Sequence, residues 1–100
     1  PGYIDTRIRP WNEKNTRSRK KGQYYEKMFM NAINTNPDFI GITSFNEWHE
    51  GTQIEPAIPK KISSYTYEDY GGNTDPYFYI NKTRALINEY EKREKSPPFD

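Results

Sequence analysis

The side chains best suited to chemistry gather in one short stretch, residues 46–51, with the sequence NEWHEG. It holds two carboxylic acids three residues apart, Glu47 and Glu50, with an indole and an imidazole between them. If the backbone turns helically here, both acids project to the same side. Cleavage of a glycosidic bond commonly needs two carboxyl groups of unequal acidity flanking that bond. The spacing therefore indicates acid–base chemistry on a sugar, with His49 able to tune either acid and Trp48 able to stack on a sugar ring or pack into a wall.

Other uses of these residues compete with acid–base catalysis. The possible metal ligands are Glu47, His49, Glu50 and Glu55. One histidine makes a poor zinc set, however, and the second histidine of the H-E-x-x-H motif is missing. A Glu-x-x-Glu pair is also often a solvated acidic turn, but this one follows an apolar run and carries an amide, an indole and an imidazole. Nucleophilic serine chemistry has no support, because Ser44 lies within that run.

The residues before the acids predict the element that positions them. Residues 39–45, FIGITSF, form an apolar run rich in β-branched and aromatic side chains, the pattern of a strand buried on both faces. Gly51 then allows a sharp turn. Ligands of parallel α/β folds bind at the carboxyl ends of strands. The acids therefore lie where such a fold keeps its active site.

Two helices are predicted on either side of this strand. The first, over residues 22–34, has an apolar stripe at Tyr25, Met28, Phe29, Ala32 and Ile33 and ends before Pro37. The second runs from Asp75 as N-cap and Pro76 as first helical residue to about Arg93. Its inner stripe is Tyr79, Thr83, Leu86, Ile87 and Tyr90. With residues 1–4 as a strand end and residues 52–74 irregular, the order is that of the last two βα units of a larger α/β barrel.

Two basic segments precede the first helix. Arg7, Arg9 and Trp11 alternate in a loop that could grip polar rings, since arginine forks bind hydroxyls and tryptophan offers a stacking face. A structural salt bridge with a packing tryptophan is the competing interpretation. The cluster of Arg17, Arg19, Lys20 and Lys21 is interpreted as a solvated helix start.

Composition narrows the class of protein. A 100-residue chain with 32% hydrophobic residues cannot cover both faces of a buried strand, so we expect a portion of a larger domain. A net charge of +1 gives no electrostatic case for nucleic acid or a membrane surface. The absence of cysteine excludes disulfides and thiolate metal sites, and no apolar run approaches the ~18 residues of a membrane span.

Two long blocks of this sequence resemble a known family. Residues 42–55, ITSFNEWHEGTQIE, and residues 1–12, PGYIDTRIRPWN, are similar to blocks of glycoside hydrolase family 99, the endo-α-1,2-mannosidases. Residues 59–61 and the tyrosine-rich approach to the last helix also resemble it. The likeness covers nearly the whole chain and is weaker over residues 71–74 and after Tyr90.

The resemblance implies a (β/α)8 TIM-type barrel of which residues 1–100 are the C-terminal portion, incomplete on its own. It implies an endo-acting, retaining glycoside hydrolase that cleaves an α-1,2-mannosidic linkage in glucosylated high-mannose N-glycans or mannan-like glycans. An animal member would lie in the Golgi lumen, anchored to the membrane only through a segment outside these residues. A bacterial member would be extracytoplasmic.

The resemblance also implies roles for individual residues. Glu47 would take the proton of the substrate's 2-hydroxyl, which attacks to form a 1,2-anhydro sugar, and Glu50 would protonate the leaving oxygen and then activate water. We predict that Arg9, Trp11 and Asn46 bind the substrate. The partner is a mannose-containing oligosaccharide, and neither metal nor other cofactor is expected.

Two alternatives remain open from the residues. The Asn46-Glu47 pair also resembles that of other retaining barrel glycosidases, in which the glutamate is the acid/base, the nucleophile lies on another strand and Glu50 is dispensable. A sugar-binding relative without turnover is the non-enzymatic alternative, in which Arg9, Trp11 and Asn46 would matter more than Glu50.

Overall fold

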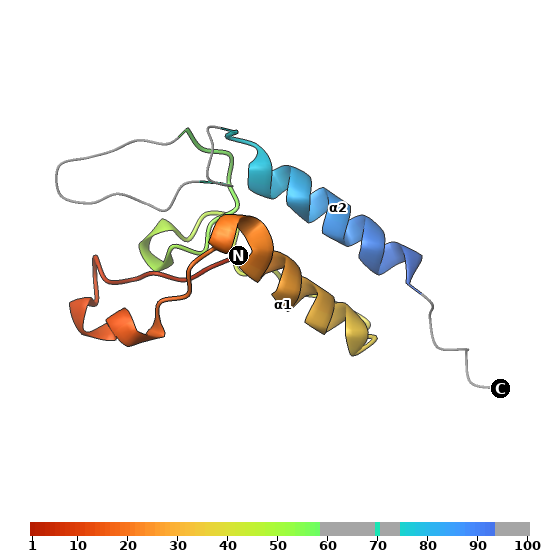
Figure 1. Cartoon of the computed structure of the whole chain (residues 1–100), viewed down its shortest axis with the longest axis horizontal. Helices are drawn as coiled ribbons and strands as arrows, with labels where there is room; N and C mark the ends of the chain where they lie inside the picture. Colours follow the sequence, from red (N-terminus) through yellow and green to blue (C-terminus); the bar gives the residue numbers. More distant parts are fainter. Residues whose placement is uncertain (59–69, 71–74, 94–100) are drawn as a thin grey trace.

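Two parallel helices dominate the structure, a computed structural model that describes residues 1–58, 70 and 75–93. Helix α1 spans Gln23–Asn34 and helix α2 spans Phe78–Lys92. They lie side by side and run in the same direction, with the loops gathered at their N-terminal ends (Figure 1). Three short 3-10 helices lie in these loops: η1 (Pro10–Asn15), η2 (Lys20–Gly22) and η3 (Trp48–Glu50).

Helix α1 forms where the sequence predicts it. Tyr25, Phe29 and Ile33, each four residues after the last, are buried on one face. Met28 was predicted on the same stripe but is half exposed, because it lies at the edge of the buried face. The helix ends before Asn36, whose left-handed φ of 52° and following proline turn the chain away.

Helix α2 begins two residues later than predicted. Phe78 is its first residue and Tyr77 its N-cap. Asp75, the predicted N-cap, accepts a hydrogen bond from the Tyr77 amide at 3.0 Å within a preceding turn, which satisfies that amide before the helix starts. Tyr79, Thr83 and Leu86 are buried as predicted, whereas Ile87 is 39% exposed.

The core lies between the two helices. The Tyr25 and Thr83 hydroxyls are hydrogen-bonded at 2.7 Å, and the Tyr25 and Tyr79 rings lie 5.9 Å apart. At the other end, the Tyr90 hydroxyl donates to the Pro37 carbonyl at 2.6 Å. Because contacts occur at both ends, α1 and α2 are held as a parallel pair, the arrangement of neighbouring helices in repeated βα units.

The predicted strand at residues 39–45 is wrong for this structure. No strand forms in residues 1–58, 70 or 75–93, and the described pairing is an isolated antiparallel bridge between Tyr3 and Arg17. A strand needs neighbouring strands to satisfy its backbone, and residues 39–42 have none here. Phe39 and Phe45 are 90% and 54% exposed.

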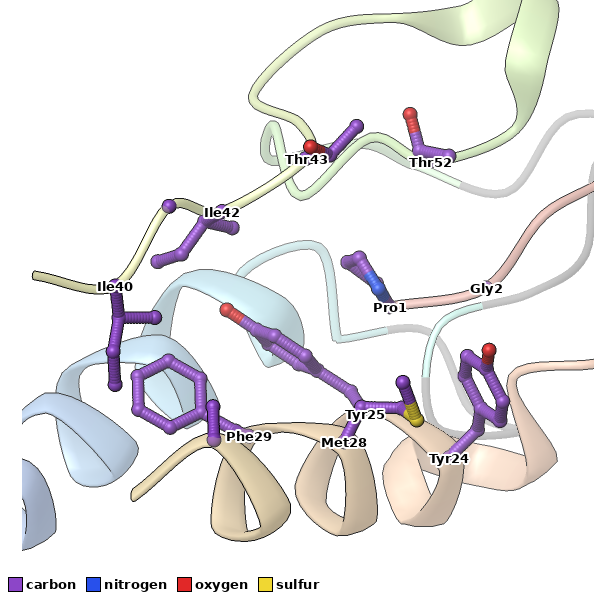
Figure 2. Close-up of a pocket in the computed structure, with 12 residues that line it drawn as sticks. Pro1, Gly2, Tyr24, Tyr25, Met28, Phe29, Ile40, Ile42, Thr43 and Thr52 are labelled. Carbon is purple, nitrogen blue, oxygen red and sulfur yellow. The ribbon is translucent and has the colours of Figure 1, made fainter. Parts of the chain in front are cut away.

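A cavity of about 320 Å³ lies between α1 and residues 40–43. Tyr25 and Phe29 project from the helix toward Ile40 and Ile42 on the opposite wall (Figure 2). The apolar run therefore faces α1 as a buried strand would, and its Ile40 and Ile42 pack against the core beside this cavity. Neither helix described here is long and apolar enough to cross a membrane.

Candidate active site

Residues 44–54 form a closed loop around the two acids. The Ser44 amide donates to the Thr52 carbonyl at 2.9 Å, and the Ile54 amide donates back to the Ser44 carbonyl at 3.1 Å. The Ser44 hydroxyl contacts the Thr52 hydroxyl at 2.7 Å and accepts the Glu47 amide at 3.0 Å. Ser44, which was predicted to lie in a strand, thus fixes the start of residues 47–51, which we call the acidic turn.

The acidic turn is a single turn of 3-10 helix closed by glycine. The Glu50 amide donates to the Glu47 carbonyl at 3.3 Å, and the Gly51 amide donates to the Trp48 carbonyl at 3.0 Å. Gly51 adopts φ = 65°, a conformation that L side chains rarely adopt. A helical turn therefore follows Glu47, which is its N-cap, and ends with Glu50.

The acidic turn docks on Ile4. The Ile4 amide donates to the Glu50 carbonyl at 2.9 Å. A Cβ atom added to Gly51 would lie 2.5 Å from Ile4 Cγ2 and 2.8 Å from the Ile4 oxygen. Only glycine permits this close approach, so residues 1–5 form one wall beside the acids.

Next to Ile4, the fully buried Asp5 is the centre of a polar cluster. Its carboxylate accepts the Tyr3 hydroxyl at 2.8 Å, Arg9 Nη1 at 3.2 Å and Asn12 Nδ2 at 3.0 Å. Its carbonyl accepts the Arg9 amide at 2.8 Å. We call Tyr3, Asp5, Arg9 and Asn12 the Asp5 cluster.

Two members of the Asp5 cluster, Asp5 and Tyr3, have shifted pKa values. Burial raises the pKa of the Asp5 carboxyl, but the hydrogen bonds from Tyr3, Asn12 and Arg9 outweigh burial and hold the pKa below its ordinary value. The hydrogen bond to Asp5, burial and the negative charges of Asp5 and Glu50 raise the pKa of the Tyr3 phenol.

The predicted site residues occupy different settings. Glu47 and Asn46 are exposed, and Glu50 is half-buried. Arg9 is bound to Asp5 with its side chain 48% exposed, and Trp11 is 78% exposed in η1. Within residues 1–58, 70 and 75–93, no hydrogen bond, ion pair or ring contact joins Arg9, Trp11 or Asn46 to either acid's side chain. Their grouping around one sugar stays a prediction.

Tyr3 and Asp5 were not among the residues predicted from the sequence. The available signal was the four-residue spacing from Asp5 to Arg9, which suits an acid–arginine pair across one turn. The structure has that pair, so the salt bridge of the competing interpretation exists. The packing tryptophan of that interpretation does not, since Trp11 is exposed.

Arg19 corrects the interpretation of the basic cluster. It is only 2% exposed, whereas Arg17, Lys20 and Lys21 are exposed as expected. Its Nη2 donates to the carbonyls of Gly51 at 3.0 Å and Gln53 at 2.7 Å. Its guanidinium also lies 4.5 Å from the centre of the Tyr79 ring and 5.2 Å from that of Tyr70. A planar cation that binds carbonyls with its edge and rings with its face is stable in this interior.

Comparison with known proteins identifies the family. Residues 1–92 match the sequence model of the family described as "Glycosyl hydrolase family 99". The chain belongs to glycosyl hydrolase family 99. The family match contains both the Asp5 cluster and the acidic turn.

Relatives within family 99 share about half of these residues. The chain is 50% identical to glycoprotein endo-alpha-1,2-mannosidase of Rattus norvegicus over its whole length, and 54% identical to that of Xenopus laevis over 95%. It spans 21% of each of these relatives. The solved family 99 endo-alpha-mannosidase from Bacteroides thetaiotaomicron superposes with a TM-score of 0.85 at 51% identity, over 92% of this chain and 27% of that one. The chain thus corresponds to part of a larger family 99 domain.

A metal centre gains no support from the side chains that were weighed as ligands. Among the residues that the structure describes, no three of His, Cys, Asp or Glu are placed to hold an ion. His49 and Glu47 are exposed on the acidic turn.

Proposed function

We propose that the protein containing this chain is a retaining endo-α-1,2-mannosidase that hydrolyses glucosylated high-mannose N-glycans or mannan-like glycans. The observation that carries the proposal is the acidic turn: Glu47 is the N-cap and Glu50 the last residue of one 3-10 turn, which is fixed to Ile4 by the Glu50 carbonyl. Relatives at about 50% identity bear the name glycoprotein endo-alpha-1,2-mannosidase.

The proposed chemistry divides the work between the two acids. Glu47 accepts the proton of the 2-hydroxyl, whose oxygen attacks the anomeric carbon and expels the leaving oxygen, which takes a proton from Glu50. Glu50 then deprotonates water, which attacks the anomeric carbon and opens the 1,2-anhydro sugar, while Glu47 returns its proton to the 2-oxygen; this restores the original configuration. Two inversions give net retention without an ester to the enzyme, which departs from the common two-carboxylate scheme. Arg9, Trp11 and Asn46 bind the glycan.

The same proposal places residues 1–100 as the C-terminal portion of one (β/α)8 catalytic barrel. The parallel pair of α1 and α2 supports it, as do the exposed Phe39 and Phe45, which neighbouring strands would cover. In an animal the enzyme works in the Golgi lumen, and in a bacterium it works outside the cytoplasm.

The experiment compares Glu47→Gln and Glu50→Gln in the full-length protein on a mannosyl-type fluoride and on a natural glycan. Glu47→Gln lowers turnover of both substrates, because the 2-hydroxyl loses its base. Glu50→Gln lowers glycan turnover by roughly 10²- to 10⁴-fold but partly spares the fluoride, whose departure needs little protonation. The exposed Glu89→Gln on α2 serves as the matched control and leaves both rates unchanged.

Three outcomes contradict the proposal. Equal losses on both substrates for Glu50→Gln exclude its role as the acid. Rescue of Glu47→Gln by azide, with a glycosyl azide of inverted configuration, indicates a conventional covalent nucleophile. Glycan binding without turnover by the wild type indicates a sugar-binding relative.

A further inference from the structure

We propose that Asp5 is a positioning residue that holds the Arg9 guanidinium and the Asn12 amide on the wall where Ile4 binds the Glu50 carbonyl, with Arg9 ready to bind the hydroxyls of the glycan. The inference rests on the proposed function and goes beyond it, because it assigns a role to a buried acid that does not touch the substrate.

The first argument is the shape of the Asp5 cluster. The Asp5 carboxylate is inaccessible to solvent and receives three side-chain donors, from Tyr3, Arg9 and Asn12. Ionised carboxylates bind such donors more strongly than neutral acceptors do. An arginine or asparagine side chain on a loop samples several rotamers, and these bonds restrict that choice.

The second argument is the place of the cluster. Asp5 follows Ile4, whose amide binds the Glu50 carbonyl at 2.9 Å and whose side chain packs against Gly51. The main chain that carries the buried carboxylate is therefore part of the wall on which the acidic turn docks. Movement of Arg9 relative to Glu50 is limited because both are attached to adjacent residues of this wall.

The third argument is what Arg9 leaves accessible. A guanidinium has five N–H donors in a planar fork, and within the described residues the Arg9 side chain has one partner, Asp5, bound through Nη1. The side chain is 48% exposed. Pairs of sugar hydroxyls fit such a fork, and a fork already fixed does not lose rotamer freedom on binding, a loss that weakens affinity by roughly 2- to 10-fold per side chain.

The test is steady-state kinetics of the full-length enzyme carrying Asp5→Asn, a change that keeps the shape and removes the charge. We expect KM for the glycan to rise by about 10-fold while kcat changes by less than about 3-fold, since Arg9 is released but the acids remain. A purely structural defect instead lowers the active fraction and the apparent kcat without changing KM. Glu13→Gln, an exposed acid in the same loop, is the matched control and leaves both constants unchanged.

The double variant with Arg9→Ala sharpens the test. If Asp5 acts through Arg9, Arg9→Ala raises KM and Asp5→Asn adds little in that background, leaving at most the smaller effect of Asn12. An unchanged KM in Asp5→Asn, or full additivity of the two substitutions, overturns the inference.

A crystal structure of the Asp5→Asn protein separates this inference from the proposed function. The inference is supported if Arg9 and Asn12 are displaced from their wild-type positions while the acidic turn stays in place. The inference is overturned if both side chains keep their wild-type positions. A wild type inactive on every α-mannosidic substrate overturns the proposed function, whatever that structure shows.

Discussion

Two buried charged residues lie in segments that contact the acidic turn, and they are stabilised in different ways. Asp5 is surrounded by side-chain donors, and one of these, Arg9, extends to the surface. Arg19 is surrounded by the carbonyls of Gly51 and Gln53 and by the ring faces of Tyr70 and Tyr79. Asp5 orders side chains around the site. Arg19 instead binds the carbonyls of Gly51 and Gln53, in the backbone that connects the acidic turn with the core.

The difference predicts that the two charges fail in different ways. Loss of Asp5 releases polar side chains that water can solvate in part. Loss of Arg19 leaves backbone carbonyls in the core without their donor, and an unsatisfied buried acceptor costs more than a lost exposed bond. Arg19 is therefore expected to govern stability, and Asp5 to govern ligand binding.

The largest expected effect is that of Arg19→Met. Two buried carbonyls lose a charged donor and two rings lose a cation, so the free energy of unfolding should fall by roughly 3–5 kcal/mol. Denaturant unfolding of the full-length protein measures it. Arg19→Lys is the matched variant: it keeps the charge but loses the planar fork, and should be only partly destabilised. Full stability in Arg19→Met would show that the carbonyl contacts contribute little.

Gly51→Ala should come next. The added Cβ meets Ile4 at 2.5 Å in a left-handed backbone, so a loss of roughly 2–3 kcal/mol is expected, together with reduced turnover because Glu50 shifts with the turn. Glu89→Ala, at an exposed position on α2, is the control. Similar losses in the two variants would contradict the close packing of Gly51 on Ile4.

Low pH should change the stability contribution of Asp5 but not that of Arg19. The folded-state pKa of Asp5 is lowered, so its contribution to stability is fully present above the ordinary value of 3.8 and is lost as pH falls through the lowered value. The stability gap between wild type and Asp5→Asn should therefore shrink below pH 3.8, measured by denaturant unfolding at a series of pH values. The gap between wild type and Arg19→Met should persist, because arginine stays protonated. If the difference in unfolding free energy between wild type and Asp5→Asn does not depend on pH, the charge of Asp5 is not what stabilises the cluster.

The smallest expected effect belongs to a surface pair. Lys82 Nζ lies 3.7 Å from Glu26 Oε2, and the Glu26 side chain is mostly exposed. Glu26→Gln should change the free energy of unfolding by less than about 0.5 kcal/mol, because water screens such pairs. A larger loss in the same assay would mean that α1 and α2 depend on this pair, and the contrast between buried and exposed charges would be weaker than we infer.

The helices could be predicted because their information is local. The stripe of Tyr25, Phe29 and Ile33 and that of Tyr79, Thr83 and Leu86 repeat with the helical period, and proline marks the end of α1. The start of α2 was missed by two residues because Asp75 caps a turn and not the helix itself.

The strand and Arg19 could not be predicted for a different reason. An apolar run at residues 39–45 states a preference for burial, but a strand also needs partners, which these residues do not contain. In the run RSRKKG, nothing distinguishes Arg19 from its neighbours, because its burial depends on Gly51, Gln53 and Tyr79. Likewise, Glu47 and Glu50 stand out as a pair, but the contact that brings them to Asp5 is a backbone bond from Ile4 to Glu50, which no side-chain pattern encodes.

The long reach of Arg19 also has a consequence for the order of folding. Its bonds to Gly51 and Gln53 join residues 32 and 34 positions apart, and the bond from Tyr25 to Thr83 spans 58. Helical turns form from neighbours within about a microsecond, whereas such distant contacts must first overcome the entropy of closing long loops. We therefore expect the acidic turn to dock late, after α1 and α2 have formed, so that weakening it accelerates unfolding more than it slows folding. A nascent chain therefore places Glu47 and Glu50 only when nearly all of these residues have reached their neighbours.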